Sequence, residues 1–404
     1  MHFPPIPRTH HLTALCCIAF GVMRLPAQLA GPPLHYTESL RLDGTQHSFV
    51  PISQIAVARD GTMAVWQMQD FKVLLFTAEG RPIGSFGKGG EGPGEFRVVG
   101  ASGWVGDTLW ILDARLHRTT LLTPRGELVR TWTWPPSLYL PGPNPQNLPD
   151  ALGGIAPGAI FSDGSFVPLP GIRLPARRAA PSTTTPSDSE NVVRVSARGE
   201  LKGVLARIPV LRTPATCVQS WQAGAVSGAI AAPFCAAPTK AFSPDGARIL
   251  FVRQRNETGK TGTFNLLVLS TRGETLLHRD IAYVPQRISD SAWKAEEAGR
   301  LFDPRLGPPP KAYRDARKRV ERLATYPPVR RAILGRDGSI WLELFGESPG
   351  HRWATIDPKD GHVIGVLDVP ANVTIRTVAR DMLWASSVDE DDVPSVVVLK
   401  VSGG

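Results

Sequence analysis

The segment Ile83–Arg97, with the sequence IGSFGKGGEGPGEFR, decides how the rest of the chain is interpreted. It holds six glycines and one proline between Gly84 and Gly94. Glycine loses more backbone entropy than any other residue in a helix or strand, and proline donates no backbone hydrogen bond. We therefore expect a loop that is neither helix nor strand. Strand-like sequence with regularly spaced turn residues lies on both sides of it.

A repeated unit of short strands surrounds this loop. In Ile55–Phe86, Asp60-Gly61 marks a hairpin turn because glycine tolerates a positive φ angle. The apolar run VLLF (73–76) indicates a strand buried on both faces. Equivalent turns recur at residues 60, 106, 163, 245, 337 and 381, a spacing typical of propeller blades with some insertions. The sequence predicts an all-β fold, a six-bladed β-propeller of four-stranded antiparallel blades.

The two ends of the repeat region complement each other. The last copy lacks an outer strand, whereas the segment HYTESLRL (35–42) belongs to no copy. Pairing the two would close the ring and remove an exposed sheet edge. We therefore expect residues 35–42 to complete the last blade.

The domain organisation predicted is a signal peptide over residues 1–30 and a propeller over residues 31–404. The apolar run LTALCCIAFGVM (12–23) follows Arg8 and has the length of a signal-peptide core, too short to span a bilayer comfortably. Ala27 and Ala30 offer cleavage points, and an uncleaved anchor is the alternative. We expect an exported protein, periplasmic or extracellular, with no transmembrane span after signal removal.

Two insertions interrupt the repeat. Residues 176–190 are rich in Pro, Ser and Thr and are predicted to form a disordered loop. A helical insertion is predicted near 289–324, with helices over 289–302 and 309–324. The second helix has a narrow apolar stripe and an otherwise basic surface, formed by Lys311, Arg314, Arg317, Lys318, Arg319 and Arg322. We interpret this surface as a solvated outer face, and contact with an anionic or membrane surface is the alternative.

Cys217 and Cys235 are the only cysteines outside the predicted signal peptide. Two cysteines in an exported chain favour a disulfide, which for a loop of this length would contribute about 3 kcal/mol. A pair of buried free thiols is the alternative. Their spacing, without partner His or Cys residues, does not indicate a zinc site.

Composition narrows the class of protein. The chain is 42% hydrophobic and 20% charged, which allows a sizeable core. Its formal net charge of +9 is spread without a Lys/Arg block of five or more, and no nucleic-acid-binding signature is present. We expect no nucleic-acid partner. Of the ten tryptophans, six stand outside the repeated positions, and we expect at most one or two of them to line a surface site: Trp104, Trp132, Trp134, Trp221, Trp293 and Trp353.

Motifs for common chemistries are missing. The glycine loop lacks the Lys-Ser/Thr end of a P-loop, and Gly100–Trp104 lacks the last glycine of a nucleophile elbow. The histidines are scattered without paired spacing. The sequence therefore predicts no catalytic residue, no metal ligand and no cofactor.

Two segments resemble known families. GSFGKGGEGPGEF resembles the interblade loop of NHL-type six-bladed propellers, which include many exported bacterial proteins, and AFSPDGARILF is similar to the repeat of TolB-like propellers. The resemblance implies the architecture rather than an activity. Related six-bladed lactonases and lyases bind a metal in the channel through residues from separate blades. One divalent metal such as Ca²⁺ in the channel is therefore the alternative to no cofactor.

The glycine loop is the predicted place of function. Loops that join one blade to the next lie at the ligand face of propellers, so Lys88, Glu91, Glu95 and Arg97 are candidate ligand contacts near the channel mouth. We predict a monomeric binding or scaffold module for a protein or small-molecule ligand, without evident catalysis. The alternatives are a metal-dependent lactonase- or lyase-like hydrolase and, by analogy with TolB, a cell-envelope assembly factor.

Overall fold

The structure is a computed structural model that describes residues 29–134, 156–161, 163–169, 189–209, 217–224, 226–299 and 308–403. The predicted signal peptide as far as residue 28 and the predicted disordered insertion as far as residue 188 lie outside these residues.

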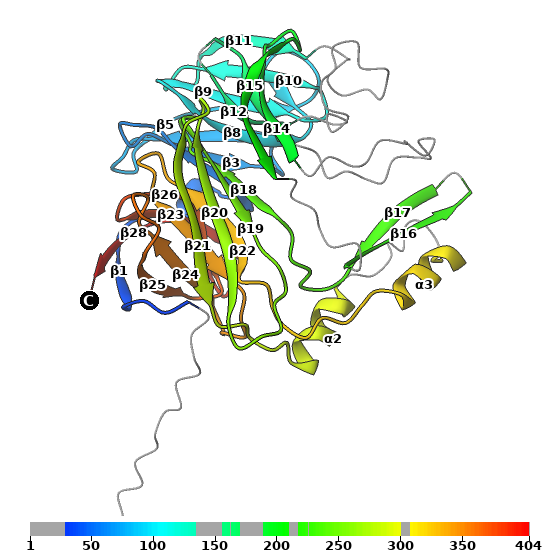
Figure 1. The fold of residues 1–404 in the computed structure, drawn as a ribbon. Helices are drawn as coiled ribbons and strands as arrows, with labels where there is room; N and C mark the ends of the chain where they lie inside the picture. The colour runs from blue at the N-terminus through cyan, green and yellow to red at the C-terminus, as the bar shows by residue number, and fades with distance from the viewer. Residues whose placement is uncertain are drawn as a thin grey trace, which may run out of the picture.

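The chain folds into six four-stranded antiparallel sheets, which are the blades of a propeller (Figure 1). Blade 1 holds β2 (Ile52–Val57), β3 (Met63–Gln67), β4 (Lys72–Phe76) and β5 (Pro82–Phe86). Blade 2 holds β8 (Val99–Val105), β9 (Thr108–Asp113), β10 (Arg118–Leu122) and β11 (Leu128–Thr133). Blade 3 holds β12 (Ala156–Ile160), β13 (Phe166–Leu169), β14 (Ser189–Val195) and β15 (Leu201–Pro209).

The second half of the ring repeats this order. Blade 4 holds β18 (Thr239–Phe242), β19 (Arg248–Arg253), β20 (Gly262–Ser270) and β21 (Thr275–Tyr283). Blade 5 holds β22 (Val329–Leu334), β23 (Ile340–Leu344), β24 (His351–Ile356) and β25 (Val363–Val369). Blade 6 holds β26 (Val373–Ala379), β27 (Met382–Val388), β28 (Pro394–Gly403) and, from the other end of the chain, β1 (Leu34–Leu42).

The first strands of the blades surround the central axis. Each of β2, β8, β12, β18, β22 and β26 contacts the first strand of the next blade, and β26 contacts β2, so the ring is closed. The six predicted turn positions all fall between the first and second strands of a blade. The predicted six-bladed propeller is therefore confirmed.

The core is divided among the spaces between blades. Six separate hydrophobic clusters occur there, each built from two neighbouring blades. Strands that serve two of these clusters are apolar on both faces, and every residue of β3 (MAVWQ) is buried. Trp66, Trp110 and Trp341, which occupy equivalent blade strands, are at most 5% exposed. Since a fully buried large apolar side chain contributes about 1.5–3 kcal/mol, these clusters hold the blades together.

Residues 35–42 complete the last blade, as predicted. β1 pairs antiparallel with β28 from Leu34 opposite Gly403 to Leu42 opposite Val396. Leu42 also packs with Ile52 and Val396 in the cluster between blades 6 and 1. After β1, Asp43 caps the short helix α1 (Gly44–His47) by accepting hydrogen bonds from the backbone of Thr45 and Gln46.

The turns between the first and second strands share one design. At Asp60-Gly61, the Gly61 amide donates to Ala58 (3.1 Å), and Gly61 has a φ of 90° that favours glycine. The Asp60 carboxylate accepts a hydrogen bond from the Thr62 amide at 2.9 Å, which is the local reason for aspartate in a turn. Equivalent carboxylate contacts occur at Asp163, Asp245 and Asp337.

The second helix of the insertion is shorter than predicted, because α3 spans Lys311–Lys318 rather than 309–324. The first predicted helix, 289–302, corresponds to α2 (Asp290–Ala298), and its residues 300–302 lie outside the described part of the chain. Beyond α3 the chain runs alongside residues 286–288, with backbone hydrogen bonds joining Ile288 to Ala324 and Tyr326 to Gln286. This tertiary pairing replaces the last helical turn. None of the helices in the described part of the chain is long and apolar enough to cross a membrane.

Candidate functional site

The long connections that the structure describes lie on one side of the propeller, which we call the long-loop face. Because the strands of a blade are antiparallel, the connections between blades share one side with the loops between second and third strands. The glycine loop, a hairpin of β16 (Val218–Ala223) and β17 (Val226–Ala231), and α2 and α3 all belong to such connections. The opposite side, the short-turn face, holds the turns between first and second strands and between third and fourth strands.

The glycine loop is folded back on itself. β6 (Lys88–Gly89) pairs in parallel with β7 (Glu95–Phe96), so the expectation of no strand in this loop was wrong for these two short segments. The ring of Phe96 is fully buried and meets Trp66 edge-on at 5.2 Å. The local sequence did not predict that the segments on either side of the glycines would pair with each other.

The four candidate ligand contacts lie together and are paired with one another. The ammonium group of Lys88 lies 3.1 Å from the Glu95 carboxylate, and Arg97 lies 3.3 Å from Glu91. Hydrogen bonds from the Gly92 amide and from Lys88 lower the pKa of Glu95. Lys88, Glu91 and Arg97 keep exposed side chains, so they remain accessible to a ligand from solvent.

Two residues that the sequence analysis missed fix this loop to blade 2. Arg118, only 9% exposed, donates to the carbonyl oxygens of Glu91 and Gly92 at 2.8 Å each, and to that of Glu95. The fully buried Asp113 accepts hydrogen bonds from backbone amides, among them that of Arg97 at 2.7 Å. The register pairs Asp113 with Arg118 across β9 and β10.

A signal for these residues existed in the repeat. The corresponding pair in blade 1 is Gln67 and Lys72. Blade 2 has an Asp and an Arg at these two positions, so it differs there from the otherwise similar blade 1. Their partners lie 15–27 residues earlier in the chain, so the contact itself required the folded structure.

The innermost strands give the channel an uneven charge. The strands β18, β22 and β26 carry four cationic residues, Lys240, Arg330, Arg331 and Arg376. The innermost strands of blades 1 to 3 carry no charged residue, and none of the six strands contains Asp or Glu. The innermost strands are therefore basic in blades 4 to 6 and uncharged in blades 1 to 3.

Arg331 is held by a carboxylate from the second strand of its own blade. Its Nε donates to Glu343 at 3.0 Å, and its guanidinium lies 4.9 Å from the ring centre of Trp353. The other oxygen of the buried Glu343 lies 2.8 Å from Nδ1 of His351. Glu343 is thus shared by two partners.

Arg376 has only neutral partners among the described residues. It donates to the hydroxyl of Ser386 at 3.0 Å and to the carbonyl of Ile52, in blade 1, at 2.9 Å. Burial lowers the pKa of Arg376, and the positive charge of Arg331 lowers it further. An anion beside Arg376 would stabilise its positive charge and so offset both effects.

The predicted metal alternative meets a donor set that does not fit it. Ca²⁺ takes six to eight oxygen ligands, usually including carboxylates. The innermost strands offer none, and the nearby Glu343 is already bound by Arg331 and His351. The innermost strands therefore contribute no carboxylate to a calcium site.

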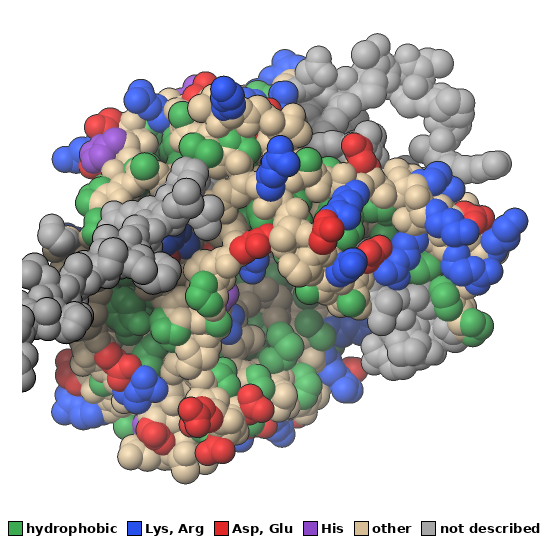
Figure 2. Space-filling view, turned by 90° about the horizontal axis from the view of Figure 1, so that it is seen from below, with side chains coloured by type: hydrophobic (Ala, Val, Ile, Leu, Met, Phe, Trp, Pro, Cys, Tyr) green, Lys and Arg blue, Asp and Glu red, His purple; other side chains and the backbone are tan. Residues whose placement is uncertain are grey.

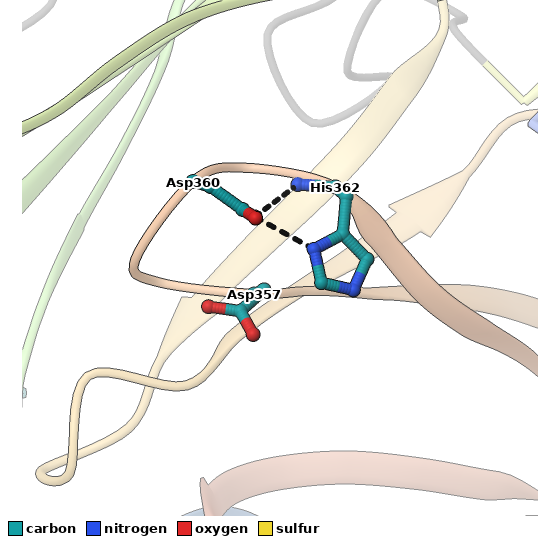
Figure 3. Close-up of side chains that lie close together, drawn as sticks. All are labelled: Asp357, Asp360 and His362. Carbon is teal, nitrogen blue, oxygen red and sulfur yellow. Dashed lines mark hydrogen bonds and ion pairs between the residues drawn. The ribbon is translucent and has the colours of Figure 1, made fainter.

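One group of possible metal ligands occurs elsewhere in the described part of the chain. Asp357, Asp360 and His362 have donor atoms within 4.8 Å of one another (Figure 3). They lie in the turn between β24 and β25, on the short-turn face and away from the channel. Asp360 accepts from both Nδ1 and the amide of His362, at 2.6 and 3.0 Å, and Asp357 accepts from the Lys359 amide. These bonds shape the turn.

The predicted disulfide is present. Cys217 and Cys235 are bonded, with their Cα atoms 5.7 Å apart. The bond closes the base of the β16–β17 hairpin, which the sequence analysis did not predict.

Figure 2, viewed from the side where α2 lies in Figure 1, shows a hollow lined by hydrophobic side chains near the middle of the molecule.

Comparison with known proteins shows likeness in fold only. No family model and no curated protein matches the chain. A DUF4221 family member from Bacteroides vulgatus is 9% identical over 93% of this chain and 100% of that chain, with a TM-score of 0.46. A putative exported protein from Bacteroides fragilis is 9% identical over 92% and 95% of the two chains, with a TM-score of 0.42. Regucalcin from Agrobacterium tumefaciens, a calcium-binding protein, is 14% identical over 93% and 98%, with a TM-score of 0.37.

Proposed function

We propose that this protein is a binding module that holds a ligand with carboxylate or phosphate groups in the mouth of its central channel. The observation that carries the proposal is the charge of the innermost strands, which hold four cations and no carboxylate. A partly buried cation is costly without a counter-charge. Arg376, which has only neutral partners among the described residues, is the best-placed contact.

Binding is favoured over hydrolysis by the same strands. The metal-dependent hydrolase alternative needs carboxylate, Asn or His ligands that converge on the channel from several blades. The described innermost strands contain none of these residues. The four charged residues of the glycine loop would then form one part of the rim around the ligand.

An exported location fits this proposal. Disulfides persist in oxidising compartments and are rare in the cytosol, so the Cys217–Cys235 bond supports a periplasmic or extracellular protein. The NHL- or TolB-like relationship remains a prediction from the two sequence segments.

Calorimetric titration tests the proposal with two anionic probes, citrate and a tetraglutamate peptide, which represent a small molecule and a protein segment. We expect at least one probe to bind, and more weakly as salt is added. The Arg376→Gln variant should raise its Kd about tenfold, equivalent to about 1.4 kcal/mol. Glutamine removes the charge without leaving a carboxylate unpaired.

The matched control is Arg125→Gln, which removes an exposed arginine from a turn on the short-turn face. Its Kd should equal that of the wild type. The proposal is wrong if neither probe binds, or if the two variants weaken binding to the same extent.

A further inference from the structure

A second cavity lies outside the propeller, in a small cap on the long-loop face. The cap consists of the β16–β17 hairpin, α2 and α3, which project together at the right of Figure 1. α3 packs on β16, where the ring of Tyr313 meets Trp221 edge-on at 5.6 Å. The apolar stripe of α3 is therefore used for packing against the hairpin.

The cavity between these three elements has a volume of about 260 Å³. One wall is apolar and is formed by Ile230, Pro233 and Val320. Trp293 of α2 adds an aromatic surface and is only 7% exposed. This volume lies just below the range of about 300–1,000 Å³ that is usual for ligand pockets, so the cavity suits a ligand smaller than a typical drug molecule.

Three cations and one carboxylate complete the lining. Arg317 is paired with that carboxylate, Glu297, at 3.8 Å. Arg322 is paired with Asp290 outside the cavity, and its guanidinium lies 5.7 Å from the Trp293 ring centre. The exposed Lys318 has no hydrogen-bond or ion-pair partner among the described residues.

The helix dipole explains only part of this arrangement. Cations are favoured at the carboxyl end of a helix, where Arg317 and Lys318 stand. Arg322 lies beyond that end, and the dipole does not account for an apolar wall beside the cations. Figure 2 shows Lys and Arg side chains gathered on the right, the side on which α3 lies in Figure 1.

We propose that this cavity binds a small organic anion, a carboxylate with an apolar or aromatic body. The carboxylate would pair with Lys318 and Arg322, and the body would lie against Trp293 and the apolar wall. This site is separate from the channel and does not depend on the function proposed above.

The disulfide supports the cavity. Ile230 and Pro233 both lie within the loop closed by Cys217–Cys235, so the bond holds one wall in place. Opening it should loosen that wall while leaving the cations on α3 unchanged.

Ligand-observed fluorine NMR with 4-fluorobenzoate tests the site, and the neutral 4-fluorobenzamide serves as the matched probe. We expect the benzoate to bind at least tenfold more tightly than the benzamide. Lys318→Gln should weaken benzoate binding about fivefold. Lys311→Gln, at an exposed position on the same helix that does not line the cavity, should leave it unchanged.

The proposal is overturned if the benzoate does not bind, if the two probes bind equally, or if Lys318→Gln and Lys311→Gln behave alike. The Cys217→Ser/Cys235→Ser variant should also weaken benzoate binding. Arg376→Gln should leave it unchanged, and an equal loss there would place the probe in the channel and overturn the cap site.

Discussion

The two faces of this propeller differ in their connections: the turns of the short-turn face resemble one another, whereas the connections of the long-loop face do not. On the short-turn face, eight of the described turns repeat one hydrogen bond, in which a glycine amide donates to the carbonyl three residues earlier. On the long-loop face the described connections differ from one another, and they contain the glycine loop, the disulfide hairpin and the helices α1, α2 and α3. The turns of the short-turn face therefore contribute mainly to the fold, whereas the connections of the long-loop face can vary and can make specific contacts.

Removing the anchor of the glycine loop should have the largest effect. Arg118→Ala deletes charge-assisted hydrogen bonds to three carbonyl groups and should cost about 3 kcal/mol of unfolding free energy. Urea unfolding measures the loss, and proteolysis within residues 87–97 should become faster. Lys72→Ala, at the corresponding exposed position of blade 1, is the control. Equal losses in the two variants would mean that Arg118 does not hold the loop.

A substitution in a turn of the short-turn face should cost less stability, and the cause is the backbone conformation of the turn. Gly338 has a φ of 93°, so Gly338→Ala should cost about 1–2 kcal/mol. Gly203 in β15 has no positive φ, and a methyl group added there would meet no atom within 4 Å, so Gly203→Ala is the matched control. We expect it to be nearly neutral in thermal unfolding. If both variants lose the same stability, strain at the turn is not the cause.

The smallest effect concerns a charge on the short-turn face and depends on pH. Burial would raise the pKa of Asp163, but hydrogen bonds from Lys202, Ser165 and Arg194 outweigh it and hold that pKa well below its usual range. The stabilisation is therefore present above the unfolded-state pKa of about 3.9 and is lost as the pH falls below it. Because the side chain is 41% exposed, Asp163→Asn should cost under about 1 kcal/mol at pH 7.

Unfolding midpoints in urea at several pH values check this prediction. The difference between wild type and Asp163→Asn should shrink between pH 6 and pH 3. A difference that stays constant over this range would show that the charge of Asp163 contributes nothing.

The sequence predicted the elements whose causes are local. Asp-Gly pairs mark turns because the aspartate accepts a nearby amide and the glycine takes a positive φ, and both effects act within a few residues. The closing strand was predicted from an unpaired strand at each end. The disulfide was predicted from the count of two cysteines.

The closing strand was predicted, but the side-chain contacts that form only when distant segments meet were not. Arg376 donates to the carbonyl of Ile52, which lies 324 residues earlier, so its environment exists only after blades 6 and 1 meet. The cap cavity likewise joins Ile230, Trp293 and Lys318 from three separate segments. For the candidate site, the sequence pointed to the glycine loop and its four charged residues, whose contact with a ligand stays a prediction; it did not point to Arg118, the basic innermost strands or the cavity.

The pairing of β1 with β28 has a consequence for how the protein is made. The Ser39 hydroxyl donates to the carbonyl of Val398, 359 residues later, so one of the first strands to be synthesised must wait for one of the last. Contacts so distant in sequence form slowly, and unpaired strand edges are exposed in the meantime. A chain that lacks either residues 34–42 or residues 394–403 leaves the other strand without its partner. The two segments are therefore mutually dependent: loss of one should expose a sheet edge that the complete ring covers.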